Sequence, residues 1–304
     1  MRGRTSLLAN DSLLLLTSLI WGLAFVAQRL GMEHVGPFTY NAVRFGIGSL
    51  CLLPLLVLRW RHGPVMQASV KPVAILPAGL LAGGLLFCGA SLQQIGLVYT
   101  TAGKAGFITG LYVVLVPLLG LLWGQRAGMS AWGGAILCVA GLFFLSFNES
   151  LGIERGDLLV LVGAFFWAGH VQVLGWLSPR TDPVRLACIQ FATCAVLSAG
   201  AALAAEHPVL TGMLSAAGPI LYGGFMSVGV AFTLQVVAQR RSPPAHAAII
   251  LSMESVFAAL GGTVVLGERL AARGALGCAL IFSGMIAAQL PVLARRTVQG
   301  GPSA

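Results

Sequence analysis

A few polar side chains stand inside long apolar stretches of this sequence, and they are the groups best placed to do chemistry. Glu254 lies near the middle of AHAAIILSMESVFAALGGTVVLGER (245–269), with no Lys or Arg within ten positions on either side. A carboxyl group at the centre of a lipid-embedded helix costs roughly 2.5–3.5 kcal/mol on insertion scales. Glu254 is therefore expected to face protein. It could carry a proton or bind an ammonium group, or it could anchor its helix by a hydrogen bond to another helix, and the anchor is the favoured interpretation.

Three basic side chains raise the same choice between binding and structure. Lys104, in TTAGKAG, either extends to the outer interface or points inward to meet a carboxylate. Arg44 either caps a neighbouring helix end or binds a solute. His170 shares a helix face with Trp167 three residues earlier, and it is either functional or held by an interhelical hydrogen bond.

Aromatic and amide side chains complete the candidate set. Trp167 lies too far inside its stretch to belong to an interfacial belt, and Trp21 occupies the matching place near the start of the chain. The two either line a site for an amphipathic substrate or pack against lipid or the core, and packing is the favoured interpretation. Gln93 and Gln94 end their span beside Ser91, with which Gln94 shares a helix face, and either one of these amides lines the cavity or they bridge helices. The candidate substrate-binding residues are Trp21, Gln94, Tyr99, Lys104, Tyr112, Trp167, His170 and Glu254, and Arg44 is a structural or possible substrate residue.

Motifs for catalysis, metal binding and cofactor binding are absent from the sequence. It has no G-x-x-x-x-G-K-[ST] nucleotide loop, no Ser-His-Asp arrangement and no two-histidine metal spacing. Its six cysteines all lie in apolar stretches without a C-x-x-C pair, as small buried residues do. We therefore expect no catalytic residue, no metal and no cofactor, and the protein is not expected to be an enzyme.

The elements that must position these residues are membrane-spanning helices. The sequence is 57% hydrophobic and only 9% charged, whereas soluble domains carry about 25% charged residues. Its apolar stretches have the length that crosses a hydrocarbon core of about 30 Å. The net charge of +9 is scattered as single and paired residues, which does not indicate nucleic-acid binding. The predicted class is an all-α polytopic membrane protein.

Ten spans account for the apolar stretches. Their expected cores are 12–31, 37–58, 74–96, 101–123, 131–147, 156–177, 183–205, 215–238, 244–267 and 274–294. With the N-terminus inside, twelve Lys and Arg residues fall on the inner side and five on the outer side. Because basic residues favour the cytoplasmic side, both termini are predicted to be cytoplasmic.

The two halves of the chain are similar. AGKAGFITGLYVVLVPLLGLLWGQR, ending at Arg126, matches PAHAAIILSMESVFAALGGTVVLGER, ending at Arg269, at an offset of about 142. Five spans follow five spans, and because five is odd the second half enters the membrane the other way up. The sequence thus predicts two inverted five-helix repeats, 12–147 and 156–294, around a central cavity, although coincidence among apolar residues is the alternative.

These segments resemble the EamA-type transporters of the drug/metabolite transporter superfamily. LSMESVFAALGGTVVLGE supplies Glu254, Val256, Phe257 and Leu-Gly-Glu of the second-half signature. It departs at Ser255, where proline is usual, and this bears on a helix kink there and not on the fold. ITGLYVVLVPLLGLLWGQR and SLIWGLAFVAQRLG followed by PFTYNAVRF resemble the matching segments of the first half. The resemblance covers about 12 to 292.

The resemblance implies a ten-span exporter of small metabolites in the bacterial inner membrane. Amino acids and their analogues are among the substrates that it implies, and YddG-like exporters of aromatic amino acids are the members to compare first. The expected partners are a small-molecule substrate and the lipid bilayer, with no nucleic acid and no obligate protein partner. An intramembrane enzyme, or a scaffold or receptor without transport activity, is the alternative. The sequence leaves the substrate, the direction of transport and proton coupling open.

Overall fold

The computed structural model describes residues 2–60, 71–146, 155–265, 267 and 272–298. Within these residues the chain is helical throughout and contains no strand. The helices are α1 (Arg2–Gly31), α2 (Pro37–Trp60), α3 (Ile75–Tyr99), α4 (Ala102–Gly110), α5 (Tyr112–Leu122), α6 (Met129–Ser146), α7 (Arg155–Leu177), η1 (Ser178–Arg180), α8 (Pro183–Ala205), α9 (Leu210–Ser215), α10 (Ala217–Leu221), η2 (Tyr222–Phe232), α11 (Thr233–Gln239), α12 (Pro244–Leu251), α13 (Glu254–Val265) and α14 (Ala272–Val298).

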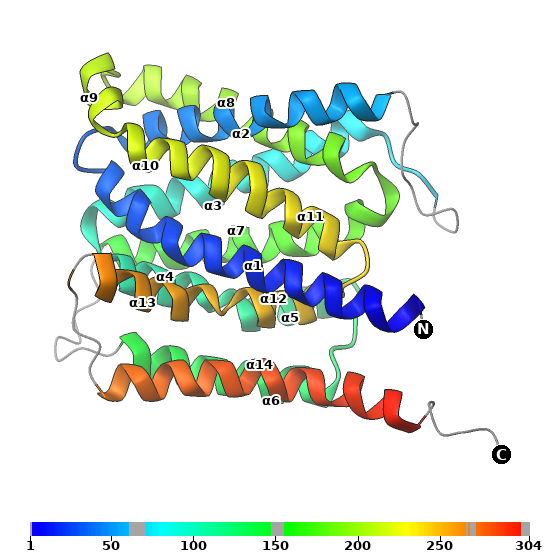
Figure 1. Ribbon diagram of the computed structural model, residues 1–304. Helices are drawn as coiled ribbons and strands as arrows, with labels where there is room; N and C mark the ends of the chain where they lie inside the picture. The colour runs from blue at the N-terminus through cyan, green and yellow to red at the C-terminus, as the bar shows by residue number, and fades with distance from the viewer. Residues whose placement is uncertain (1, 61–70, 147–154, 266, 268–271, 299–304) are drawn as a thin grey trace.

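The helices form a bundle of roughly parallel and antiparallel rods, and their bounds fall within a few residues of most of the spans expected from the sequence (Figure 1). Eight helical segments of the described chain are long and apolar enough to cross a membrane. Two shorter apolar helices, Met129–Phe144 and Ala272–Ala287, lie in α6 and α14, which pack against each other. The start of α1 and the end of α14 lie at the same end of the bundle, opposite α9. The prediction of a polytopic helical membrane protein is confirmed.

Apolar side chains cover both the interior and the outer surface of this bundle. Leu50, Leu122, Leu203 and Val264 are among the many large apolar side chains that are exposed. In water such a surface would lead to aggregation, whereas in a bilayer it faces lipid tails. The interior is therefore marked by its buried polar side chains and by its close helix contacts, since hydrophobicity alone does not distinguish inside from outside.

Small residues let the helices of the two halves approach closely. The Gly106-x-x-x-Gly110 motif of α4 faces α13, where a Cβ on Gly110 would lie 2.8 Å from Ser255 Oγ. A Cβ on Gly79 in α3 would lie 2.3 Å from Ile189 in α8. Both contacts are examples of small residues packing at the crossing points of membrane helices.

We expect the substitution Gly22→Val to destabilise the protein strongly. A Cβ at Gly22 of α1 would lie 2.4 Å from Phe257 Cβ and 2.7 Å from the Glu254 carbonyl oxygen of α13. Because backbone cannot move aside as a flexible side chain can, the loss should exceed the about 1–3 kcal/mol typical of overpacking. Thermal unfolding in detergent measures it. Gly84→Val in α3 is the matched control, since nothing lies within 4 Å of a Cβ there. Equal melting temperatures for the two variants would contradict this packing.

Two spans are interrupted at matching places. α4 ends at Gly110 and α5 begins at Tyr112, while α12 ends at Leu251 and α13 begins at Glu254. The Leu115 N–H donates to the Leu111 carbonyl at 3.3 Å, and 142 residues later the Phe257 N–H donates to the Met253 carbonyl at 3.1 Å. The second interruption forms without the proline usual at Ser255. Ser255 instead donates from Oγ to the Gly106 carbonyl at 2.8 Å, a bond to α4 that proline could not make.

Candidate functional site

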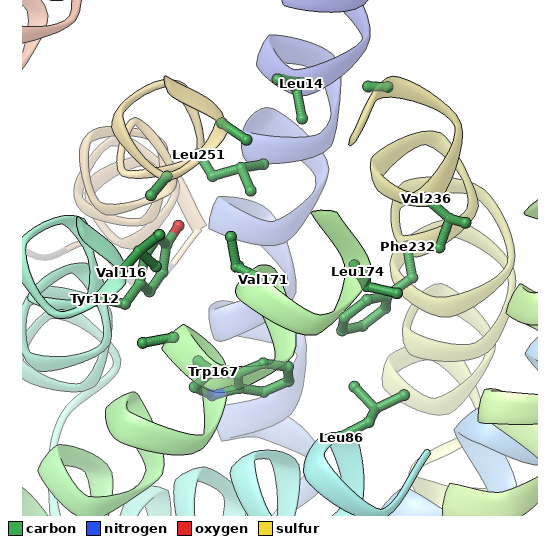
Figure 2. Close-up of a cluster of buried hydrophobic side chains, with 14 of the residues drawn as sticks. Leu14, Leu86, Tyr112, Val116, Trp167, Val171, Leu174, Phe232, Val236 and Leu251 are labelled. Atoms are coloured by element: carbon green, nitrogen blue, oxygen red, sulfur yellow. The ribbon is translucent and has the colours of Figure 1, made fainter. Parts of the chain in front are cut away.

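A cavity lies inside the bundle between the two halves of the chain. Its volume is about 40 Å³, which is room for a few water molecules. Side chains from both halves of the sequence contribute to its wall, and Figure 2 shows several of them converging from different helices. The lining residues are Trp21, Phe25, Gln28, Arg44, Gln93, Thr109, Tyr112, Trp167, Val171, Ser227, Phe232, Gln235, Leu251 and Glu254.

Ten of these fourteen lining residues form five pairs related by the repeat. Members of two pairs are 146 residues apart, and members of the other three are 142 apart, which is the offset between the similar halves of the sequence. The pairs are Trp21 with Trp167, Phe25 with Val171, Gln93 with Gln235, Thr109 with Leu251, and Tyr112 with Glu254. Equivalent positions of the two halves thus face one shared space.

Three aromatic rings form one wall of the cavity. Phe232 of η2 lies between the two tryptophans, with its ring centroid 4.5 Å from that of Trp21 and 5.9 Å from that of Trp167. Trp21 Nε1 donates to the Ser227 carbonyl at 3.2 Å. This bond satisfies the Trp21 indole N–H group, and the three rings pack against one another as an apolar surface beside the cavity.

A hydrogen-bonded network of side chains continues from the aromatic wall at Trp167. Gln93 Oε1 accepts from Trp167 Nε1 at 2.9 Å and from Thr109 Oγ1 at 3.4 Å. Gln93 Nε2 donates to Gln28 Oε1 at 3.1 Å. Because each bond orients the next, the network holds amide and hydroxyl groups of α1, α3, α4 and α7 in one place.

Glu254 lies on the cavity wall and is 3% exposed. It is the first residue of α13, and the hydroxyl of its repeat counterpart Tyr112 lies close enough to interact with its carboxyl group. Yet neither Glu254 Oε1 nor Tyr112 Oη has a hydrogen-bond partner among the described residues. The expected anchoring bond to another helix is therefore not formed by Oε1.

Arg44 is a buried cation on the same wall, 2% exposed. Its Nε donates to Asn41 Oδ1 at 2.9 Å, one turn earlier in α2. The guanidinium carbon lies 4.7 Å from the Phe45 ring centroid and 5.4 Å from that of Tyr40. No carboxylate of the described chain pairs with it. No hydrogen bond from Arg44 to a neighbouring helix end is seen among the described residues, and the side chain that bonds to a helix backbone here is Tyr40, whose hydroxyl donates to the Pro219 carbonyl at 3.0 Å.

The structure places four predicted substrate residues outside this lining. His170 is fully buried behind the aromatic wall, where its Nε2 lies 3.0 Å from Gln190 Oε1 of α8. This is the interhelical hydrogen bond that the sequence allowed as its alternative role. Gln94 is also fully buried, and its Nε2 donates to the Gln28 carbonyl at 3.4 Å. Its neighbour Gln93 is the amide that reaches the cavity.

The other two lie near the ends of helices. Tyr99 is 58% exposed at the end of α3. Lys104, in the first turn of α4, lies 3.6 Å from Asp157 Oδ2 of α7. Neither residue lines the cavity.

Comparison with known proteins identifies the chain. Two stretches, residues 9–147 and 154–288, match the EamA-like transporter family. The chain belongs to this family. An uncharacterized transporter of Archaeoglobus fulgidus is 32% identical over 92% of this chain and 85% of its own length. The uncharacterized inner membrane transporter YedA of Escherichia coli is 28% identical over 83% of this chain and 81% of its own length.

The fold of this EamA-like transporter occurs in a solved crystal structure. That structure is 22% identical and superposes with a TM-score of 0.74, covering 95% of this chain and 98% of the other. Both family matches together include all fourteen lining residues of the cavity. The transporter is a multi-pass membrane protein, and relatives such as YedA are named as inner membrane transporters.

Sequence reasoning missed several lining residues of this EamA-like transporter. Gln28, Thr109, Ser227 and Gln235 are polar residues within apolar helices, and that signal alone could have marked them. The repeat offset could have found Gln235 from Gln93. Phe232 carried no signal, because an aromatic residue in an apolar helix is unremarkable in sequence.

Proposed function

We propose that this protein is a secondary transporter that exports small amphipathic metabolites, with amino acids as the substrate class. One observation carries the proposal: Arg44 and the Glu254 carboxyl group line one cavity together with three aromatic rings. Neither group is in an ion pair among the described residues. Charged groups within membrane helices usually mark a substrate or ion pathway, because burying them without a role is costly.

The cavity chemistry matches an α-amino acid group by group. The Arg44 guanidinium keeps its charge in proteins and suits a carboxylate. Glu254 can accept hydrogen bonds from an ammonium group, and the face of Trp21 or Trp167 suits an apolar or aromatic side chain. Aromatic amino acids are therefore the substrates that we propose to test first. Proton coupling through Glu254 is a further role compatible with this placement.

We propose that the chain crosses the bacterial inner membrane ten times as two inverted repeats, with both termini in the cytoplasm. The five repeat-related pairs around the cavity and the matching helix interruptions support this arrangement. So does the position of the start of α1 and the end of α14 at one end of the bundle. A substrate site at the interface of two inverted repeats is common among secondary transporters.

The direct test of this function is efflux from proteoliposomes. Purified protein should release preloaded radiolabelled phenylalanine or tryptophan faster than protein-free vesicles, and unlabelled substrate outside should exchange with it. Running the assay with and without a pH gradient tests coupling. Glucose and putrescine, which lack the carboxylate–ammonium pair, are the control solutes. Release of every solute at the same rate would contradict a selective site, and release of none of the amino acids would exclude this substrate class.

A further inference from the structure

Two ion pairs join the halves of the chain. His246 Nε2, in the first turn of α12, lies 2.9 Å from Asp11 Oδ1 of α1. Lys104 Nζ, in the first turn of α4, lies 3.6 Å from Asp157 Oδ2 of α7. All four side chains are only partly exposed, between 11% and 21%. Each pair therefore bonds an interrupted helix of one half to the first helix of the other half.

The two pairs are counterparts under the repeat. Lys104 and His246 are 142 residues apart, and Asp11 and Asp157 are 146 residues apart. These are the same two offsets that relate the paired residues of the cavity wall. The positions of the charges are thus reproduced in both halves, although the basic residue differs between them.

The pairs lie at opposite ends of the bundle. Asp11 belongs to the first part of α1, at the end where the chain begins (Figure 1). Three helices, α1, α2 and α3, cross the bundle before Lys104 opens α4, so the Lys104 pair lies at the other end. The cavity lies further along the same interrupted spans, at Thr109 and Tyr112 in one and at Leu251 and Glu254 in the other.

A hollow of about 440 Å³ adjoins the His246 pair. It is lined by His246 and Ile249 of α12, by Pro117 of α5 and by Arg126, which follows α5. Leu251, two residues beyond Ile249, already lines the central cavity. His246 thus stands where an open vestibule approaches the small cavity, and it is bonded to Asp11 across the seam of the two halves.

We propose that the Asp11–His246 and Lys104–Asp157 ion pairs hold the two ends of the transport path closed, and that each pair breaks when its own end opens. The two pairs are called the end latches below. The proposal rests on the proposed function, because it assumes that a solute passes through the cavity. The cavity has room for only a few water molecules, so we expect helices of the two halves to move apart when a solute enters, and the α1–α12 and α4–α7 contacts are two of the contacts that join the halves. Those are the contacts that the two pairs bridge.

The two latches differ in strength. Lysine is a permanent cation partner, whereas histidine is charged only when it is protonated. Asp157 also accepts a hydrogen bond from Thr100 Oγ1 at 2.7 Å. Ser242, which is 142 residues after Thr100, has an Oγ without a partner among the described residues. The His246 contact is shorter, 2.9 Å against 3.6 Å, but the Lys104 end has the permanent charge and the additional Thr100 bond, so we expect the His246 end to open more readily without substrate.

Thiol labelling of the cavity tests the latches without requiring the substrate to be known. Ser227→Cys, in a background lacking the six native cysteines, places one thiol on the cavity wall. A membrane-impermeant methanethiosulfonate is applied to right-side-out or inside-out vesicles. Lys104→Gln should raise the labelling rate from the periplasmic side about fivefold, and His246→Gln should raise the labelling rate from the cytoplasmic side. A fivefold effect corresponds to the lower end of the coupling free energies that are typical between two sites of a protein.

Two further variants make the result specific. The exchange Lys104→Asp with Asp157→Lys restores an ion pair and should return labelling to the background rate. Lys71→Gln removes the same charge from an exposed position and should change nothing. Labelling that is equal in Lys104→Gln, His246→Gln and Lys71→Gln would overturn the latch proposal while leaving the proposed function intact. A thiol never labelled from either side, in any variant, would overturn both.

Discussion

The substitution Arg44→Gln is expected to lower amino-acid efflux by about a hundredfold without lowering the melting temperature. Removing one partner from a buried pair between a guanidinium and a carboxylate costs about 3 kcal/mol, which corresponds to about that factor. In the substrate-free protein Arg44 has no acidic partner among the described residues. Deleting its charge breaks no ion pair and removes a desolvation cost, which offsets the loss of the Asn41 hydrogen bond and of the contacts with the Tyr40 and Phe45 rings. Proteoliposome efflux and thermal unfolding are measured on the same preparation.

Matched variants separate substrate binding by Arg44 from a structural role. Arg44→Lys keeps the charge but loses the planar pair of donors, so it should retain part of the activity. Arg180→Gln removes an arginine whose Nη1 donates to the Trp176 carbonyl outside the cavity, and it should export normally. Amino-acid amides, which lack the carboxylate, should be released equally slowly by wild type and Arg44→Gln. A large drop in melting temperature with unchanged efflux would show that Arg44 is structural.

The substitution Glu254→Gln should fold normally and lose most of its preference for free amino acids over their N-acetyl derivatives. The amide keeps the shape of the side chain but cannot offer a negative charge to an ammonium group. We expect a loss of about 30- to 100-fold for the free amino acid, in line with about 2–3 kcal/mol for a buried charged hydrogen bond. Competition of the two compounds for efflux measures the preference directly.

Tyr112→Phe is the control for Glu254, because it removes a hydroxyl that interacts with the carboxyl group and leaves the carboxyl itself. It should keep the preference for the free amino acid. If Glu254→Gln instead exports both compounds like wild type while Glu254→Leu unfolds, Glu254 is the helix anchor that the sequence favoured. If Glu254→Gln keeps binding but loses only gradient-driven export, its role is proton transfer.

The membrane class and the helix bounds could be read from the sequence because both follow from local composition. Pro37 begins α2, and Pro183 and Pro244 begin α8 and α12, as expected for a residue that lacks the N–H a helix start leaves unpaired. The interruption after Leu251 had no such local marker, because Ser255 replaces the usual proline. The helix breaks there within a crowded interface, where Ser255 bonds to α4.

Some residues of the cavity could likewise be predicted from the sequence, and others could not. Trp21, Tyr112, Trp167 and Glu254 were found because a polar or indole group inside an apolar helix is rare and costly. Gln93 and Gln94 cannot be told apart from the sequence, because adjacent residues differ by about 100° in direction on a helix and the sequence does not show which direction faces the other half. Arg44 and His170 each allowed two roles until their neighbours were known.

The sequence by itself determined the membrane class, the order and length of the helices, and the similarity of the two halves, because each follows from the identity and spacing of residues along one chain. Only the tertiary structure decided which polar groups share a space. It brings Arg44, Tyr112 and Glu254 to one cavity, takes His170 behind the aromatic wall, and pairs Asp11 with a histidine 235 residues away. The physical reason is that the rotation of each helix is set by close contacts such as Gly22 against Phe257. In a bundle that is apolar inside and out, no hydrophobic face of the helix fixes that rotation beforehand.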